Sequence, residues 1–270
     1  MAPPSSETSP IAVVAAMPEE LAPLRGLLTG IVRSRAGGLE IERGWLNGRW
    51  VELAATGDGA ANARAGIGTL LASGPVDGLL VIGVAGALSA GLPSGALVVG
   101  TRVVDEDGRS FAADPDRVAA VARAIGGRTG VVVSAGRIAD STAEKQRLAR
   151  TAKAGVAAAV VDLESATYLA AATAAGIPWL VLRSVSDTAD EALPGLLNQS
   201  RDGGGAVRRG QVLFGLLRQP QALPFLLTLR GRVARCAEVL AAAVAAALPV
   251  FDRAGWASPS APGIARGAVS

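Results

Sequence analysis

Carboxylates and one arginine follow the apolar segments of this sequence, and such groups can carry acid–base chemistry. Three apolar runs, IAVVAAM, AAAVV and PWLVL, each lead directly into polar residues. The charged residues that follow them are Glu19 and Glu20, Asp162 and Glu164, and Arg183 and Asp187. The chain contains no histidine, the most frequent general base, so acid–base chemistry must use Asp, Glu, Lys or Tyr.

Each of these charged groups also has a structural explanation. A glutamate in the first turn of a helix is stabilised by the helix dipole, which accounts for Glu19 or Glu20. Asp162 or Glu164 suits the N-cap of a following helix, and Asp187 suits a turn with Thr188. Taken one at a time, the acids therefore do not distinguish a structural role from a catalytic one.

The segment TGDG raises the same ambiguity. Its Gly57/Gly59 pair is a weak phosphate-loop signal, because the third glycine and the Lys-Ser/Thr ending of such loops are absent. A plain strand-to-helix turn is the simpler interpretation. Asp58 within this turn has no explanation from the sequence.

Strand and helix patterns alternate along the chain. Asn47-Gly48 between two alternating segments predicts a β-hairpin over 39–56, and Ser141 with Glu144 forms a capping box. The predicted strands are 11–17, 78–86, 96–105, 129–135, 157–164 and 178–187. The predicted helices are 18–28, 60–73, 115–125, 141–151, 165–175, 206–217 and 221–248.

This order predicts an α/β fold with a mixed, mostly parallel central sheet flanked by helices. Residues 10–252 show no linker that divides the core, so we expect a single domain. The Pro/Ser-rich segments 1–9 and 253–270 are expected to be disordered. Because sites in such folds lie at the carboxyl ends of the strands, we expect the acids and the arginine to converge on one edge of the sheet.

Composition narrows the function classes. The net charge of +3 is too small and scattered for a nucleic-acid interface. The single cysteine, Cys236, and the missing histidines predict neither a metal site nor an internal disulfide. No signal peptide is apparent, and the apolar stretch 239–251 is too short to span a bilayer. We therefore expect a cytoplasmic protein without stable membrane insertion.

Four segments together resemble a known family. IAVVAAMPEEL, GLLVIGVAGAL, VVDLESA and LVLRSVSDTAD are similar, over about residues 10–190, to the purine nucleoside phosphorylase/nucleosidase superfamily. They resemble most its 5′-methylthioadenosine/S-adenosylhomocysteine nucleosidase branch, whereas the later segment VLFGLLRQPQALPFLLTLRGRVARCAEVL is similar to the hopanoid-associated phosphorylases, which act on adenosylhopane. The resemblance implies a three-layer phosphorylase/hydrolase-like fold.

The resemblance also implies roles for three acids. Glu164 would bind the ribose 2′ and 3′ hydroxyls, since an ionised carboxylate accepts two hydrogen bonds. Asp187 would face purine N7 and donate a proton as the base departs. Glu20, in the Met-x-Glu-Glu stretch, would position the attacking water.

Other positions follow from the same match. Arg183 would help hold the water or the ribose, Ser186 would orient Asp187, and Leu163 would pack against the ribose. The segment that would surround the nucleophile is Val84, Ala85 and Gly86. A serine is frequent at the first of these positions in the family, and Val84 cannot replace its hydroxyl, which favours water over phosphate as the nucleophile.

The sequence therefore predicts hydrolysis of an adenine nucleoside with a 5′ substituent, without a cofactor and without a metal. The alternatives are a phosphorylase acting on adenosylhopane and a non-catalytic nucleoside-binding protein with the same fold. The long C-terminal helix suits an apolar 5′ group, but equally suits core packing or a dimer face. A dinucleotide-binding oxidoreductase is poorly supported, because no strand is followed by GxGxxG. The resemblance also implies a homodimer or a larger homo-oligomer.

Overall fold

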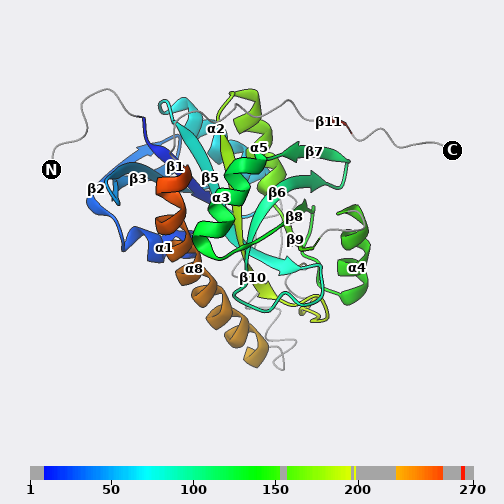
Figure 1. The fold of residues 1–270 in the computed structure, drawn as a ribbon. Coiled ribbons are helices and arrows are strands. Elements are labelled where there is room, and N and C mark those ends of the chain that lie inside the picture. Colours follow the sequence, from blue (N-terminus) through cyan, green and yellow to red (C-terminus); the bar gives the residue numbers. More distant parts are fainter. Residues whose placement is uncertain (1–8, 153–156, 196–197, 199–222, 252–262, 265–270) are drawn as a thin grey trace.

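A computed structural model describes residues 9–152, 157–195, 198, 223–251 and 263–264 (Figure 1). Within these ranges it is an α/β fold with helices on both faces of a mixed sheet, as predicted. The helix predicted over 206–217 lies outside the described residues. Of the C-terminal segment 253–270, the structure describes only the two residues of strand β11.

The strands begin with β1 (Ile11–Ala15), which is buried throughout. Further along the chain lie β2 (Thr29–Ala36), β3 (Leu39–Leu46), β4 (Arg49–Ala55), β5 (Gly78–Ala87) and β6 (Leu97–Asp105). The remaining strands are β7 (Arg109–Ala112), β8 (Arg128–Ser134), β9 (Ala159–Asp162), β10 (Trp179–Asp187) and β11 (Gly263–Ile264).

The centre of the sheet consists of parallel strands. β4, β1, β5 and β10 lie side by side in that order, all parallel, so their carboxyl ends meet at one edge. β10 also pairs with β6, β6 with β8, β8 with β9, and β9 with β5. Because β5 pairs with β10, these five strands form a closed ring. The hairpin β3–β4 and strand β2 extend the sheet on the other side of β1.

Two groups of helices cover the two faces. Helices α2 (Ala60–Ala72) and α5 (Ser165–Ala174) share one apolar cluster with the sheet. Helices α1 (Pro18–Arg25), α3 (Pro115–Ile125) and α8 (Leu223–Phe251) share the other, and Figure 1 shows these three in front of the sheet. Helix α4 (Thr142–Thr151) packs against β8 and β9 in a third cluster. Because both faces are covered, β1 and β5 are apolar throughout.

The hairpin turn is formed as its sequence predicts. Asn47 and Gly48 have φ angles of 49° and 80°, the left-handed values that a type I′ turn requires at both central positions. β3 and β4 pair antiparallel on either side, from Ile41 opposite Ala54 to Leu46 opposite Arg49.

The sequence analysis did not predict strands β2, β7 and β11, and β11 lies in the segment 253–270 that was expected to be disordered. β2 is exposed along almost its whole length, so it lacks the apolar alternation that marks a half-buried strand. β7 has only four residues and pairs with β6. Helix α1 ends at Arg25 rather than continuing to residue 28 as predicted, and β9 ends at Asp162 rather than at residue 164.

Helix α8 is long and apolar enough to cross a membrane by length and composition, and 44% of its most apolar window is buried inside the fold. Its C-terminal half packs on the core through Leu240, Val244 and Leu248. In the described part of the chain this helix is therefore a covering layer of the sheet, consistent with the core-packing alternative.

Candidate active site

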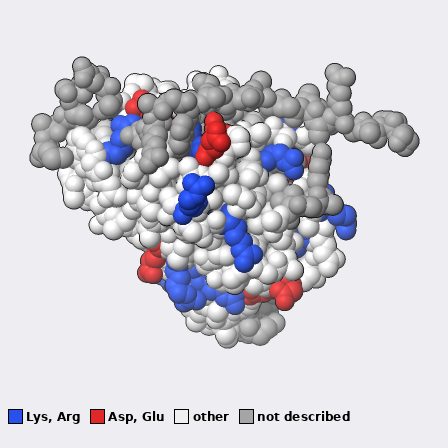
Figure 2. All heavy atoms as spheres, in the orientation of Figure 1, with Lys and Arg blue, Asp and Glu red and all other residues white. Residues whose placement is uncertain are grey.

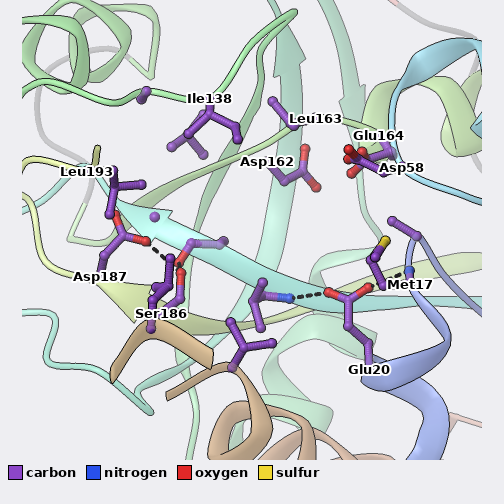
Figure 3. Close-up of a pocket in the computed structure, with 18 residues that line it drawn as sticks. Met17, Glu20, Asp58, Ile138, Asp162, Leu163, Glu164, Ser186, Asp187 and Leu193 are labelled. Atoms are coloured by element: carbon purple, nitrogen blue, oxygen red, sulfur yellow. Dashed lines mark hydrogen bonds between the residues drawn. The ribbon is translucent and has the colours of Figure 1, made fainter. Parts of the chain in front are cut away.

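A cavity of about 330 Å³ lies at the carboxyl ends of β1, β5, β9 and β10. Figure 3 shows its lining side chains, which come from these strand ends, from the turn before α2 and from α8. The predicted site residues that line it are Glu20, Val84, Ala85, Gly86, Leu163, Glu164, Ser186 and Asp187. The lining extends from Ala16, after β1, to Val233 in α8, so segments from both ends of the described chain supply one site.

Glu20 is held by two backbone amides. Its Oε2 accepts a hydrogen bond from Met17 N at 2.9 Å, and its Oε1 accepts one from Val84 N at 2.8 Å. Glu20 lies in the first turn of α1, and the first of these bonds caps that helix, so the residue has a structural contact as well as a place in the cavity. Burial raises the pKa of Glu20, and these two hydrogen bonds and Arg183 oppose the rise.

Val84 takes part in the site through its backbone. The side chain lacks a hydroxyl, but the amide fixes Glu20 across the parallel strands β1 and β5. The preceding Gly83 leaves room for this arrangement: a Cβ there would overlap the guanidinium of Arg183 and lie 2.9 Å from Glu20 Oε1.

Glu164 is the N-cap residue of α5, but its side chain makes no capping hydrogen bond. Its Oε1 accepts a hydrogen bond from Gly59 N at 2.8 Å, which ties β9 to the turn after β4. Burial and the neighbouring Asp162 raise the pKa of Glu164 to about 8, and the bond from Gly59 opposes this rise. Gly59 has a φ of 89°, a backbone conformation that suits glycine. The Gly57/Gly59 segment therefore serves as a strand-to-helix turn that positions Glu164.

Asp162, which also lines the cavity, forms a buried ion pair with Arg183. Arg183 Nη2 donates hydrogen bonds to Asp162 Oδ2 and, at 2.7 Å, to Ser165 Oγ. Arg183 is only 3% exposed and is not among the lining residues. Burial disfavours its charge, but Asp162, Glu20 and Glu164 outweigh that effect and raise its pKa. The arginine therefore supports the acids from behind the cavity wall.

Asp187 ends β10 and is 3% exposed. Its Oδ1 accepts a hydrogen bond from Ser186 Oγ at 2.6 Å, and its Oδ2 pairs with Lys145 Nζ at 2.5 Å. Thr188 instead bonds Asp190, so the turn with Thr188 does not use Asp187. Ser186 and Lys145 therefore each contact one carboxylate oxygen of Asp187.

The sequence analysis missed Lys145. This side chain is 1% exposed, although it lies in a helix that was predicted correctly. A signal was present: Lys145 shares the buried face of α4 with Leu148 and Ala152, at spacings of three and four residues. A lysine on the apolar face of a helix needs a buried partner, and the periodicity does not identify that partner.

Asp58 also lines the cavity, where Figure 3 shows its carboxylate beside that of Glu164. Its charge contributes to the raised pKa values of both Glu20 and Glu164. Across the cavity the lining is apolar, with Ile138, Leu193 and two residues of α8, Leu229 and Val233. The site thus has an acidic wall and an apolar wall.

In the described residues no group of three or more acidic, histidine or cysteine side chains could hold a metal ion. Figure 2 shows one face of the molecule, on which cationic and acidic side chains are scattered among uncharged ones.

The layered α/β fold thus carries an acid-lined cavity at the carboxyl ends of its strands. The family profile of the phosphorylase superfamily matches residues 10–217, and the chain belongs to this superfamily.

A curated relative is the 5′-methylthioadenosine/S-adenosylhomocysteine nucleosidase of Actinobacillus succinogenes, 28% identical over 199 residues, or 67% of this chain and 86% of the relative. Similar solved structures include the futalosine hydrolase mutant of Helicobacter pylori, with a TM-score of 0.70 and 18% identity over 90% of this chain and 99% of that one. The Neisseria meningitidis 5′-methylthioadenosine/S-adenosylhomocysteine nucleosidase in complex with methylthio-immucillin-A has a TM-score of 0.70 and 21% identity, over 89% and 98% of the two chains. These structures share the fold.

Proposed function

We propose that the protein hydrolyses the N-glycosidic bond of an adenosine with a 5′ substituent and releases adenine. The observation that carries this proposal is that Glu20, Glu164 and Asp187, from three different strand ends, all line one cavity. The nucleosidase activity named for the curated relative supports the same reaction class.

The reaction follows from the chemistry of these groups. Ionised Glu164 accepts hydrogen bonds from the ribose 2′ and 3′ hydroxyls and so fixes the sugar. The C1′–N9 bond breaks, its electron pair remains with adenine, and Asp187 protonates N7. The sugar becomes oxocarbenium-like, as in glycoside cleavage generally, and the acidic wall stabilises its positive charge. Water held by Glu20 adds to C1′ and loses its proton to that glutamate.

The experiment is an adenine-release assay over a panel of nucleosides, with and without phosphate. The panel contains methylthioadenosine, S-adenosylhomocysteine, futalosine and an adenosyl lipid, the first three because proteins similar to this chain are named for them. For futalosine the assay follows release of its base, hypoxanthine. Adenine and free ribose product without added phosphate are the expected result. Formation of a ribose 1-phosphate only when phosphate is present would instead identify a phosphorylase.

Asp187→Asn tests the role of the acid. We expect kcat for adenine release to fall by about 10²–10⁴-fold, the usual contribution of a general acid. Circular dichroism and thermal unfolding would check that the variant is folded. Adenine release at the wild-type rate would contradict this role for Asp187.

A second candidate is phosphorolysis of adenosylhopane, as the resemblance of the C-terminal segment implies. The observation in its favour is that Leu229 and Val233 of α8 form part of the apolar wall of the cavity. If no nucleoside of the panel is cleaved and one is nevertheless bound, the non-catalytic alternative is correct.

We also propose that the chain from 10 to 252 is a single domain, that it assembles as a homodimer or larger homo-oligomer, and that it is cytoplasmic. The continuous sheet from β7 to β2 supports the single domain. Light scattering coupled to size-exclusion chromatography measures the assembly.

A further inference from the structure

Lys145 is a buried cation that takes no part in the reaction steps described above. Its Nζ donates to Asp187 Oδ2 at 2.5 Å, to Thr188 O at 2.5 Å and to Glu191 O at 2.9 Å. An ammonium group has three N–H donors, so all three are satisfied. Two of the three acceptors are backbone carbonyls, and only Asp187 carries a charge that balances the lysine.

This pair raises a chemical question about Asp187. A carboxylate that accepts a hydrogen bond from an ammonium group is an acceptor, whereas the departing adenine needs a donor at N7. An ammonium beside a carboxylate nevertheless holds the same number of protons as an amine beside a carboxylic acid. The pair as a unit therefore contains one proton that it can give to the leaving group.

We propose that Lys145 is a positioning residue that acts through Asp187 and holds the proton that adenine takes up on leaving. This inference rests on the proposed function. As the C1′–N9 bond breaks, Asp187 passes a proton to N7 and Lys145 Nζ passes one to Asp187. Neutral Lys145, ionised Asp187, adenine and the sugar cation then remain, so charge and protons balance. The proton that Glu20 takes from water returns to the pair through solvent after release of the products.

The other acids near Lys145 are engaged with other groups. Glu191 uses its carboxylate to bind Arg232 of α8 at 2.6 Å and 2.7 Å, and only its carbonyl faces the lysine. Asp190 accepts a hydrogen bond from Thr188 Oγ1, and this bond, together with a smaller effect of Lys145, lowers the pKa of Asp190. Among the described residues facing Lys145, Asp187 is thus the acid in direct contact with the ammonium.

Lys145→Met tests the inference through the pH dependence of kcat. A lysine ammonium ordinarily keeps its proton to much higher pH than a carboxyl does. With Lys145 present, an ammonium group supplies the proton that Asp187 passes on, whereas in the variant the carboxyl of Asp187 is the only source of that proton within the pair. We expect the alkaline limb of the kcat profile to move to lower pH, with a loss of about 10²-fold at pH 8.

A second substrate shows whether Lys145 supplies a proton or only supports the fold around Asp187. A nitrophenyl riboside with the same 5′ substituent has a leaving group that departs as a stable anion and needs no proton. Lys145→Met should change its hydrolysis by less than about threefold, because the general acid is not used for it. Arg150→Met is the control, because Arg150 is an exposed cation on the same helix, and it should leave both rates unchanged.

Three results would overturn the inference: an unshifted alkaline limb, full adenine release by Lys145→Met, or equal losses on both substrates. If Lys145→Met does not fold, Lys145→Gln takes its place, because the amide still donates to the two carbonyls but carries no charge. If the wild-type protein cleaves no nucleoside, the proposed function and this inference both fail. If the wild type cleaves a nucleoside and Lys145→Met is unaffected, the inference about Lys145 fails while the proposed function stands.

Discussion

Two acids that stand two residues apart in the sequence have different partners. Asp162 balances the buried charge of Arg183, whereas Glu164 accepts a single backbone hydrogen bond and faces the cavity. Asp162 also accepts a bond from Ser165 N at the start of α5, although at 3.4 Å this bond is long. At the scale of the residue, Glu164 can bind ribose hydroxyls because its carboxylate has lone pairs available to accept their hydrogen bonds.

The first prediction concerns the pH dependence of substrate capture. The pKa of Glu164 is raised to about 8, so this carboxyl is largely protonated in the free protein at lower pH. A protonated carboxyl has an O–H donor in place of one acceptor site and is uncharged, so it holds the two ribose hydroxyls less tightly than a carboxylate does. We expect kcat/KM to rise with pH up to about 8, measured with the best substrate of the panel.

Glu164→Gln is the matching variant. It keeps the shape of the side chain and removes the ionisation, so the acid limb should flatten while kcat/KM falls by about 10- to 100-fold through weaker hydrogen bonds to the hydroxyls. An acid limb that persists unchanged in the variant would show that another group, such as Glu20, controls it.

The second prediction concerns Gly83. Alanine at this position would push against Arg183 and Glu20, which the strand end brings close to the backbone. We expect Gly83→Ala to lower kcat by at least about tenfold through misplacement of the acid. Gly68→Ala is the control, since a Cβ at Gly68 meets nothing within 4 Å. Equal activity of the two variants would contradict the tight packing at Gly83.

At the scale of the element, helix α8 serves two purposes along its length. Its C-terminal half covers the sheet, and its N-terminal half places Leu229 and Val233 in the wall of the cavity. Arg232, between these two residues, bonds Glu191 and so joins the helix to the segment that holds Lys145. One helix therefore connects the apolar wall to the acid at the end of β10.

The third prediction tests the apolar wall. Leu229→Ala removes apolar surface that a 5′ substituent would cover, so KM should rise about 10-fold for a substrate with a bulky apolar 5′ group and less for methylthioadenosine. The ratio of the two kcat/KM values is the measurement. Leu227→Ala is the control on the same helix, because Leu227 is 59% exposed and does not line the cavity. An unchanged ratio would exclude contact between α8 and the substituent.

At the scale of the whole molecule, stability and function oppose each other at the acidic wall. Glu20, Glu164 and Asp58 lie around one cavity, and burial makes the ionised state costly for the two glutamates. Their raised pKa values mean that the folded state holds more protons than the unfolded chain near neutral pH. Stability contributed by these groups is therefore greatest at low pH and falls as the pH rises towards about 8.

The fourth prediction follows from this fall in stability with rising pH. Glu164→Gln should be more stable than the wild type, and the difference in unfolding free energy should grow from pH 5 to pH 8, because only the wild type loses a buried proton in this range. Urea unfolding at several pH values measures it. Glu40→Gln, at an exposed side chain, is the control. A difference that does not change with pH would contradict the raised pKa.

The sequence predicted the central strands, most helices and the hairpin because these depend on local patterns. Continuous apolar runs mark the buried parallel strands, and Asn47-Gly48 supplies the left-handed turn. The candidate acids could be located because each follows a buried strand, and parallel strands bring such ends together. The exposed strand β2 and the short strand β7 carried no comparable pattern.

By itself the sequence determined the layers of the fold and the edge at which Glu20, Glu164 and Asp187 lie. Only the tertiary structure decided what each acid contacts: the amide of Val84 for Glu20, Gly59 for Glu164 and Lys145 for Asp187. These partners are separated from the acids by 42 to 105 residues. Periodicity indicates which face of an element is buried, but the contact across that face depends on how distant elements pack, and no local pattern encodes it.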